Sequence, residues 1–433
     1  MIYDNQRSRP APSAVSSPIR QFYPAFLIAW IFCLLFYFAQ YALRSAPGIM
    51  MPELTQAFTL NALGVSSLVG LYYYTYSLFA LVAGALLDRY GAKYVIPAGV
   101  AMLAVGSTLF GAGLVTSAEC GRLLQGAGGA FAFTGAVYLA THGFPARYLA
   151  TAIGFTQCFG MLGGSAGQLL VAPLIHGPIS WQQFWFYSGI AILVIAVLML
   201  LVTPASTNEP TATKTSFWSM FAPYKTVLSN PQSYLCGIAA GLLFLPTTIG
   251  DMIWGVAFLR DGWHLGYSEA VLRTTMVPLG WVIGCPILGY LADHLGRRKP
   301  VLIAGAVVML IATLAILYLP PETLPPYLAG FMLGFGSGAA MIPYTMIKEL
   351  NPDRVKGSAT GAINFLVFTL SALTAPLYGW LLSDISHGIM TLAVFQQAGA
   401  AGVGGIVIAI ILSCFIRETG SSVKPCPPVS KEV

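Results

Sequence analysis

Two charged residues stand inside long apolar stretches of this sequence: Arg44 closes the first stretch, and Asp251 lies well within a later one. A charge at the centre of a lipid bilayer costs about 2.5–3.5 kcal/mol on insertion scales, so a charge within a membrane-length stretch is a functional candidate. A guanidinium can hold a carboxylate through two parallel hydrogen bonds. A carboxylate can hold an amine or carry a proton. The two residues therefore predict recognition of a charged small molecule, proton transfer, or both.

A polar motif occurs twice, each time at the end of an apolar stretch. Its positions are Gly84, Asp88, Arg89, Gly91 and Lys93 in the first copy and Gly289, Asp293, Gly296, Arg297 and Arg298 in the second. The first glycine lets a neighbouring helix approach closely, and the glycine after the aspartate permits a tight turn. The aspartate can pair with a basic residue or accept hydrogen bonds from the N-terminus of a neighbouring helix. We expect Asp88 to meet the helix that starts near Gly357.

The elements that must position these residues follow from an apolar composition. Of the 433 residues, 57% are hydrophobic and 8% are charged, whereas a soluble protein carries about 25% charged residues. So few charges cannot cover a surface that faces water, and the predicted solvent for most of the chain is the lipid bilayer. The net charge of +6 does not indicate nucleic acid, because the charges lie in short loops and not on one face.

Twelve stretches are long enough to cross a bilayer, which takes about 20 apolar residues in a helix. They predict an all-α membrane protein and span 22–44, 62–87, 95–116, 120–141, 149–174, 183–203, 233–260, 268–292, 300–318, 324–347, 357–384 and 390–416. The polar residues 1–21 are not expected to be a cleavable signal peptide, because the apolar stretch after them is too long and many more follow.

The basic residues test the predicted number of spans. If the N-terminus is cytoplasmic and twelve helices alternate, 17 of the 21 Lys and Arg residues lie on the cytoplasmic side. The other four are Arg44, Arg122, Arg260 and Arg273. This is the bias expected for twelve spans with both termini in the cytoplasm, and an odd number of spans would disturb it.

An internal repeat relates the two halves of the chain. The motif aspartates are 205 residues apart, and Gly154 and Gly361 are 207 apart. A constant offset near half the chain predicts two six-helix bundles in the same orientation. Arg44 and Asp251 are also 207 residues apart, so they occupy equivalent positions in the two halves. The predicted parts are a cytoplasmic tail at 1–21, a bundle at 22–203, a cytoplasmic linker at 204–232, a second bundle at 233–416 and a cytoplasmic tail at 417–433.

These features together resemble the major facilitator superfamily of secondary transporters, over nearly the whole chain. The repeated motif matches the family's Gly-x-Leu-x-Asp-x-x-Gly-x-x-Lys/Arg loop in both copies, and the stretch from Arg122 to Gly129 is similar to its Arg-x-x-Gln-Gly-x-Gly element. The resemblance implies two bundles around a central cavity that opens alternately to each side of the membrane. It also implies that the cavity is lined by 22–44, 120–141, 233–260 and 324–347.

The resemblance also suggests roles for the charged positions. The repeated motif is expected to be a conformational latch that holds the cytoplasmic side closed in one state; the alternative is a solvated loop with ordinary positive-inside charges. Arg44 and Asp251 have three interpretations: they grip a zwitterionic solute, they bond to each other as an outer gate, or they anchor helix ends in the headgroup region. A straight helix that starts at Phe22 places Arg44 about 33 Å along its axis, in the outer half of the membrane.

Neighbouring residues complete the predicted site. The tyrosines at 72, 73, 74 and 76 cannot all face one way, so one or two are expected to line the cavity, with Tyr73 as a candidate, and the rest to pack. Trp254 is a second candidate aromatic, with packing as the alternative. Pro246 and Gly250 predict a kink just before Asp251. For proton coupling Asp251 is the best-placed carboxylate; Arg122 is either a structural or proton-linked residue, or an arginine that reaches the interface.

The sequence therefore predicts a secondary active transporter of a small polar metabolite, such as an amino acid, a peptide or an organic anion. Transport is expected to be coupled to protons and to proceed by alternating access. The protein is expected to be a monomer in the plasma (inner) membrane. A drug/proton antiporter is the alternative within the fold, and a membrane-embedded receptor or sensor the alternative outside it. No catalytic or nucleotide-binding motif indicates an enzyme or an ATP-driven pump. No cofactor or metal site is predicted, and most of the cysteines lie in apolar runs as packing residues.

Overall fold

The computed structural model of this chain describes residues 24–205, 221–323, 325–352, 355–386 and 388–420. The described residues form helices and no strands. Twelve helical segments among them are long and apolar enough to cross a membrane, which confirms the predicted all-α membrane fold.

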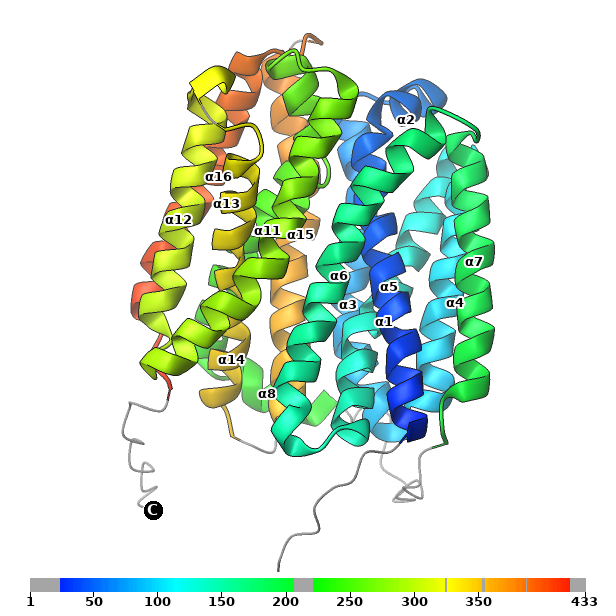
Figure 1. The fold of residues 1–433 in the computed structure, drawn as a ribbon, viewed down its shortest axis with the longest axis vertical. Helices are drawn as coiled ribbons and strands as arrows, with labels where there is room; N and C mark the ends of the chain where they lie inside the picture. Colours follow the sequence, from blue (N-terminus) through cyan, green and yellow to red (C-terminus); the bar gives the residue numbers. More distant parts are fainter. Residues whose placement is uncertain (1–23, 206–220, 324, 353–354, 387, 421–433) are drawn as a thin grey trace, which may run out of the picture.

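The helices pack in two groups (Figure 1). The first group is α1 (Pro24–Ile49), α2 (Met51–Phe58), α3 (Ala62–Tyr90), α4 (Ala92–Phe110), α5 (Val115–Gly143), α6 (Ala146–Ile175) and α7 (Trp181–Val202). The second is α8 (Ala222–Leu228), α9 (Pro231–Leu245), α10 (Gly255–Ala257), α11 (Tyr267–Leu295), α12 (Lys299–Tyr318), α13 (Leu328–Ser337), α14 (Ile342–Glu349), α15 (Lys356–Ser386) and α16 (Leu392–Phe415), with the shorter turns η2 (Pro246–Asp251), η3 (Phe258–Gly262), η4 (Pro321–Thr323) and η5 (Gly338–Met341). We call them the N-bundle and the C-bundle.

Two helix pairs join the bundles along their length. Helix α3 packs against α15, and α6 packs against α11. The offset of the sequence repeat relates α3 to α11 and α6 to α15, so each pair is the repeat image of the other. The contacts between the bundles thus have the two-fold relation that a parallel repeat requires.

The seventh membrane segment is broken, as its proline and glycine predict. Pro246 follows α9 directly, and the backbone then forms hydrogen bonds five residues apart, from Met252 N to Thr247 O (2.9 Å) and from Trp254 N to Ile249 O (3.2 Å). This wide turn is a π-helix, which inserts an extra residue into the helical path and is frequent at functional sites. Asp251 is the last residue of this turn.

The structure differs from the sequence prediction at two connections. Helix α1 does not end at Arg44 but continues to Ile49, and the short helix α2 follows it. Helix α8 lies within the predicted linker, where Tyr224 is buried and donates a hydrogen bond to Leu81 O (3.0 Å) in α3. Both short helices form because they dock on a bundle, since eight isolated residues would not be helical in water.

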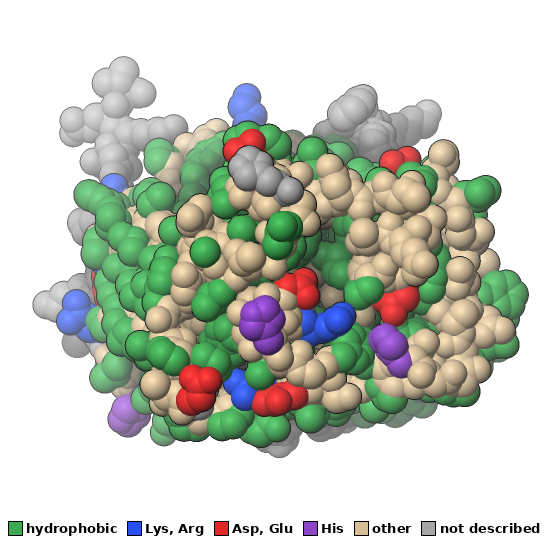
Figure 2. Space-filling model, turned by 90° about the horizontal axis from the view of Figure 1, so that it is seen from above, with side chains coloured by type: hydrophobic (Ala, Val, Ile, Leu, Met, Phe, Trp, Pro, Cys, Tyr) green, Lys and Arg blue, Asp and Glu red, His purple; other side chains and the backbone are tan. Residues whose placement is uncertain are grey.

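The two ends of the molecule differ in their side chains. The first residue of α1 and the last of α16 lie at the same end, here called the inner end, with α2 at the opposite, outer end (Figure 1). Figure 2 views the outer end, where acidic and basic side chains gather beside a hollow near the middle. The cytoplasmic location of the inner end remains a prediction from the distribution of basic residues.

Candidate functional site

Arg44 lies in the interior of the protein, surrounded by aromatic rings. Its side chain is 1% exposed, so the interpretation of Arg44 as a headgroup anchor is wrong. Because α1 continues for another turn and a half, the guanidinium is held between α1, α3 and α15. Five ring centroids lie within 6 Å of its central carbon: Tyr41 at 4.9 Å, Tyr72 at 5.7 Å, Tyr73 at 5.0 Å, Tyr76 at 5.9 Å and Phe368 at 4.7 Å. The ring faces stabilise the cation by cation–π attraction.

The Arg44 guanidinium has few hydrogen bonds. Nε donates to the Tyr73 hydroxyl at 3.4 Å, and Nη1 and Nη2 have no partner among the described residues. A buried cation without a counter-ion is strongly unfavourable unless a ligand supplies one. The two free nitrogens form the planar fork that binds a carboxylate or phosphate with two parallel hydrogen bonds.

A small central cavity lies beside this cluster. Three of the rings around Arg44, those of Tyr41, Tyr76 and Phe368, also line it. Its other walls come from both bundles: Tyr37, Phe133 and Gln157 on one side and Phe244, Met341, Tyr344 and Asn364 on the other. The cavity holds about 10 Å³, which is room for about one water. The bundles must therefore separate to admit a solute.

The polar groups of the central cavity pair with each other in this closed arrangement. Tyr37 donates to Gln157 Oε1 (3.2 Å), and Tyr344 donates to Asn364 Oδ1 (2.8 Å). Each pair lies within one bundle, so both pairs can remain intact when the bundles separate. They can also exchange a partner for a polar group of the solute.

The four tyrosines of the α3 cluster have different surroundings, and one of them lines the central cavity. Tyr73 is buried and bridges the bundles, because its hydroxyl also donates to Thr248 O (3.3 Å) in the broken segment. Tyr72 bonds to Gln40 within the N-bundle. Tyr74 is 39% exposed. Tyr76, and not Tyr73, contacts the central cavity.

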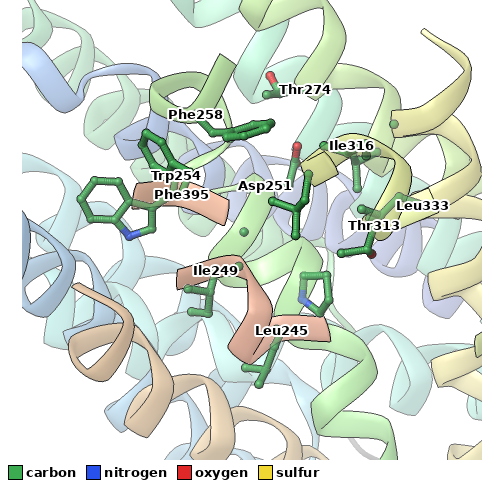
Figure 3. Close-up of a pocket in the computed structure, with 18 of the residues that line it drawn as sticks. Leu245, Ile249, Asp251, Trp254, Phe258, Thr274, Thr313, Ile316, Leu333 and Phe395 are labelled. Carbon is green, nitrogen blue, oxygen red and sulfur yellow. The ribbon is translucent and has the colours of Figure 1, made fainter. Parts of the chain in front are cut away.

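Asp251 faces a different space from Arg44. Its carboxylate accepts a hydrogen bond from Gln168 Nε2 of α6 (3.1 Å), and the ion pairs formed by the described residues do not include one between Arg44 and Asp251. Asp251 lines a cavity of about 460 Å³ within the C-bundle, among Trp254, Phe258, Leu333 and Phe395 (Figure 3). The structure therefore does not place the two charges on a common solute-sized space.

Trp254 separates the C-bundle cavity from an outer vestibule. It lines both the C-bundle cavity and a vestibule of about 370 Å³ that also contacts Gly48, Arg260 and Asp261. Below the vestibule the bundles touch: a Cβ on Gly48 would overlap the carbonyl of Met252, and Tyr267 donates to Ile49 O (3.0 Å). The predicted gate residue Trp254 thus lies where the first and seventh membrane segments meet.

Arg122 is fully buried in the N-bundle. Its side chain is 0% exposed, so it does not reach the interface as one interpretation supposed. Nη1 donates to Gln125 Oε1 (2.7 Å) and Nη2 donates to Val69 O (3.1 Å). The guanidinium also lies 5.0 Å from the centroid of the Tyr72 ring, which is 5.7 Å from the central carbon of the Arg44 guanidinium. Arg122 can thus influence the Arg44 cluster through a shared ring.

The glycines of the repeated motif have different surroundings. Gly91 and Gly296 have φ of 73° and 61°, so the tight turns are confirmed. A Cβ on Gly84 would lie 3.4 Å from the Tyr224 hydroxyl, whereas a Cβ on Gly289 would meet nothing within 4 Å. The expected close approach of a helix is therefore wrong at Gly289. The side chain of Asp88, and with it the expected contact near Gly357, lies outside what the structure describes.

The second copy of the motif forms a charged network at the inner end. Arg298 pairs with Asp293 and with Glu349 Oε1 (3.1 Å) at the end of α14. Burial alone lowers the pKa of Arg298, but hydrogen bonds to Glu349 and Asp293 outweigh it and raise the pKa above the ordinary value. Glu418, just after α16, accepts from the backbone N–H of Arg298 (2.7 Å) and Lys299 (3.1 Å), at the start of α12.

These contacts join elements of the C-bundle to each other and do not cross to the N-bundle. Arg297 is exposed and lies 3.6 Å from Glu418. In the first copy, Arg89 lies over the ring of Tyr90 at 5.5 Å, and Lys93 is partly buried. The described contacts favour a brace of the C-bundle; a latch between the bundles remains a prediction.

Comparison with known proteins identifies the family. The sequence model of the Major Facilitator Superfamily matches residues 33–376 and 244–425. The chain belongs to this superfamily. Together the two matches span almost all the predicted membrane segments.

Relatives that are named as transporters of small organic compounds match most of the chain. The chain is 26% identical over 331 residues to the "Probable 4-methylmuconolactone transporter" of Cupriavidus pinatubonensis, covering 72% of this chain and 74% of that protein. It is 24% identical over 388 residues to the 3-(3-hydroxy-phenyl)propionate transporter of Escherichia coli, covering 88% and 91%. A crystal structure of a bacterial homolog of the human lysosomal transporter Spinster shares the fold with a TM-score of 0.72 at 16% identity, covering 91% and 97%.

As a superfamily member, the chain is a multi-pass membrane transporter of small organic solutes and not an enzyme. Sequence reasoning missed several residues of its site. Phe368 and Tyr344 face the centre from α15 and α14, and Gln168 is the partner of Asp251. Each lies within an apolar run, and the sequence does not show which side of that helix faces the site.

Proposed function

We propose that this transporter carries a small organic anion, together with protons, by alternating access between the two bundles. Arg44 holds the carboxylate of the solute, and the rings around the central cavity enclose its apolar part. The inner end faces the cytoplasm, the chain works as a monomer, and it lies in the plasma (inner) membrane, as its bacterial relatives and its distribution of basic residues suggest.

The unpartnered guanidinium of Arg44 is the observation that supports an anion. Its two terminal nitrogens are buried without acceptors among the described residues, and three of the rings around the guanidinium also line the cavity where the bundles meet. A buried fork of this kind favours a planar carboxylate over a neutral or cationic solute. The aromatic walls suit an aryl or unsaturated acid, and the E. coli relative is named for a compound that joins a phenyl ring to a propionate.

Asp251 supports the proton coupling. Among the described residues it is the one acidic side chain that is buried. It ends the π-turn of the seventh segment, next to the outer contact between the bundles. A carboxyl at such a break can load a proton in one conformation and release it in the other, because the break lets the segment bend.

Solute uptake by the purified chain in proteoliposomes tests whether the transported solute is an anion. The assay compares labelled phenylpropionate, phenylalanine and phenylpropylamine, which share a body and differ in charge, with and without an inward proton gradient. We expect phenylpropionate to be taken up and Arg44→Gln to reduce its kcat/KM at least about tenfold, the effect of removing a charged hydrogen-bond partner. Arg417→Gln, an exposed change at the inner end, is the matched control. Normal uptake by Arg44→Gln would reject the proposal.

Asp251→Asn tests, in the same vesicles, whether Asp251 couples transport to protons. The amide keeps the shape of the side chain and can still bond to Gln168, but it cannot carry a proton. We expect this variant to lose accumulation driven by the proton gradient and to retain exchange of labelled for unlabelled phenylpropionate. Gradient-driven accumulation by Asp251→Asn at the wild-type level would show that another group carries the proton.

A further inference from the structure

One large cavity lies within the C-bundle and not between the bundles. It holds about 460 Å³ and is bounded by the broken seventh segment and by α11, α12, α13, α15 and α16. The central cavity holds about 10 Å³. Pockets for drug-sized ligands fall in the range of about 300–1,000 Å³. The C-bundle cavity is therefore large enough to take a whole organic molecule in this conformation; the outer vestibule, at about 370 Å³, is of similar size but opens between the bundles.

The walls of the C-bundle cavity are apolar around one carboxylate. Figure 3 shows Asp251 among Leu245, Ile249, Phe258, Leu333 and other apolar side chains. Asp251 Oδ2 accepts the bond from Gln168, and Oδ1 has no hydrogen-bond partner among the described residues. The basic residue on the same wall, Arg273, pairs with Glu269 (2.5 Å). The carboxylate thus has no counter-ion in the part of the chain that the structure describes.

An aromatic ring supports a cation in this space. Trp254 is 5% exposed and lines the cavity together with Asp251. The face of an indole ring attracts a cation, so an ammonium group beside Asp251 can also be stabilised by this ring.

The cavity extends to the surface that would face lipid. Leu377 of α15 and Ile408 of α16 line it and are 59% and 51% exposed. The wall formed by α16 is made of small residues, because Gly399, Gly402, Gly404 and Gly405 all contribute to it. A Cβ on Gly402 would meet nothing within 4 Å. An amphipathic molecule dissolved in the bilayer can thus enter between α15 and α16.

We propose that this cavity is a second binding site, distinct from the central site, that takes a lipophilic amine from the membrane. The ammonium group pairs with Asp251, and the hydrocarbon body lies against Phe258, Leu333 and the glycine wall of α16. Charge complementarity decides the class of ligand, since the site offers an unpaired carboxylate and no free cation among its described residues.

Binding of three matched probes to the full chain in phosphatidylcholine nanodiscs tests this site. The probes are labelled phenylbutylamine, phenylbutanol and phenylbutyrate, with empty nanodiscs as the background. We expect saturable binding of the amine, and binding of the alcohol at least about tenfold weaker, because a charged hydrogen bond is worth about 1.5–3 kcal/mol. Equal affinity for the amine and the alcohol would overturn the proposal.

Four variants test whether the amine binds in the C-bundle cavity. Asp251→Asn and Gly402→Phe are each expected to weaken amine binding at least about tenfold, by removing the charge and by filling the space. Asp261→Asn, an acid of the vestibule, and Gly154→Phe, a ring added in open space on α6, are the matched controls and should bind normally. Full amine binding by both Asp251→Asn and Gly402→Phe would reject the site.

Arg44→Gln separates this site from the proposed anion site. We expect Arg44→Gln to keep amine binding and to lose binding of phenylbutyrate. Loss of the amine in Arg44→Gln would place it in the central site and overturn the second site. Unchanged phenylbutyrate binding would instead contradict the anion site, while leaving the result for the amine intact.

Discussion

At the scale of single residues, the position of Arg44 depends on the side chains that hold it. Among the described residues the guanidinium has one hydrogen bond, to the hydroxyl of Tyr73, and that hydroxyl also donates to Thr248 O across the interface of the bundles. Tyr73 therefore orients the guanidinium and also contacts the seventh membrane segment. The rings of its neighbours supply attraction but little direction, because a cation over a ring face can rotate freely.

Tyr73→Phe tests this positioning role. The change keeps the ring and removes two hydrogen bonds, each worth about 0.5–1.5 kcal/mol. We expect KM for the transported anion to rise about 2–10-fold with the protein still folded and inserted, measured as initial uptake rates in proteoliposomes. Tyr74→Phe on the exposed side of α3 is the control. A KM equal to the wild-type value in Tyr73→Phe would show that the rings alone hold Arg44.

The sequence could predict that Arg44 and Asp251 matter, but not that they face different spaces. Their offset of 207 residues predicts equivalent positions if both segments are regular helices. The π-turn ending at Asp251 breaks that condition, because an inserted residue rotates the following side chain by about 100° around the helix axis. Pro246 and Gly250 predicted a kink, yet neither specifies the size of the rotation.

At the scale of elements, the start of α12 depends on a carboxylate from a distant part of the chain. Residue 298 precedes α12 and has no side-chain cap of its own. Glu418, 120 residues later, accepts its backbone N–H instead. The negative charge also favours a helix N-terminus, where the helix dipole is positive. The contact thereby ties the end of α16 to the start of α12 at the inner end of the C-bundle.

Removal of this contact is expected to destabilise the C-bundle. Glu418→Ala should lower the free energy of unfolding by about 1 kcal/mol, the usual cost of losing a helix cap, and Glu418→Gln by less, because the amide oxygen can still accept. Thermal unfolding of the purified protein in detergent, followed by tryptophan fluorescence, measures the effect. Glu322→Gln, an exposed acid in η4, is the matched control. An unchanged midpoint in Glu418→Ala would contradict the capping role.

The long elements were predictable and the short ones were not. Each membrane segment is specified by its apolar length, and the twelve predicted stretches match twelve helices in the structure. Helices α2 and α8 have no such signal, because each is seven or eight residues long and forms through tertiary contacts. Leu54 in α2 is 0% exposed, and Tyr224 in α8 bonds to α3, so packing decides both helices.

At the scale of the whole molecule, the sequence repeat predicted the symmetry but not the conformation. The offset relates α3 to α11 and α6 to α15, and the structure joins α3 with α15 and α6 with α11. A transporter must move these two interfaces as it alternates, whereas contacts within each bundle can persist. Which side is open depends on small differences between packed states, and a pattern of apolar residues does not encode that balance.

A disulfide across α6 and α11 tests whether the bundles must move. A Cβ on Gly164 would lie 3.5 Å from Cβ of Pro278, within the separation of about 3.5–4.5 Å found in disulfides. In a chain whose native cysteines are serines, oxidised Gly164→Cys/Pro278→Cys should hold the bundles in the present arrangement. We expect uptake into proteoliposomes to fall at least about tenfold and to recover on reduction, because the solute reaches its site only when the bundles separate.

The control pair is Gly154→Cys/Pro278→Cys, since a Cβ on Gly154 has no neighbour within 4 Å. Full uptake by the crosslinked protein would mean that the solute passes without relative motion of α6 and α11, and alternating access at this interface would have to be abandoned.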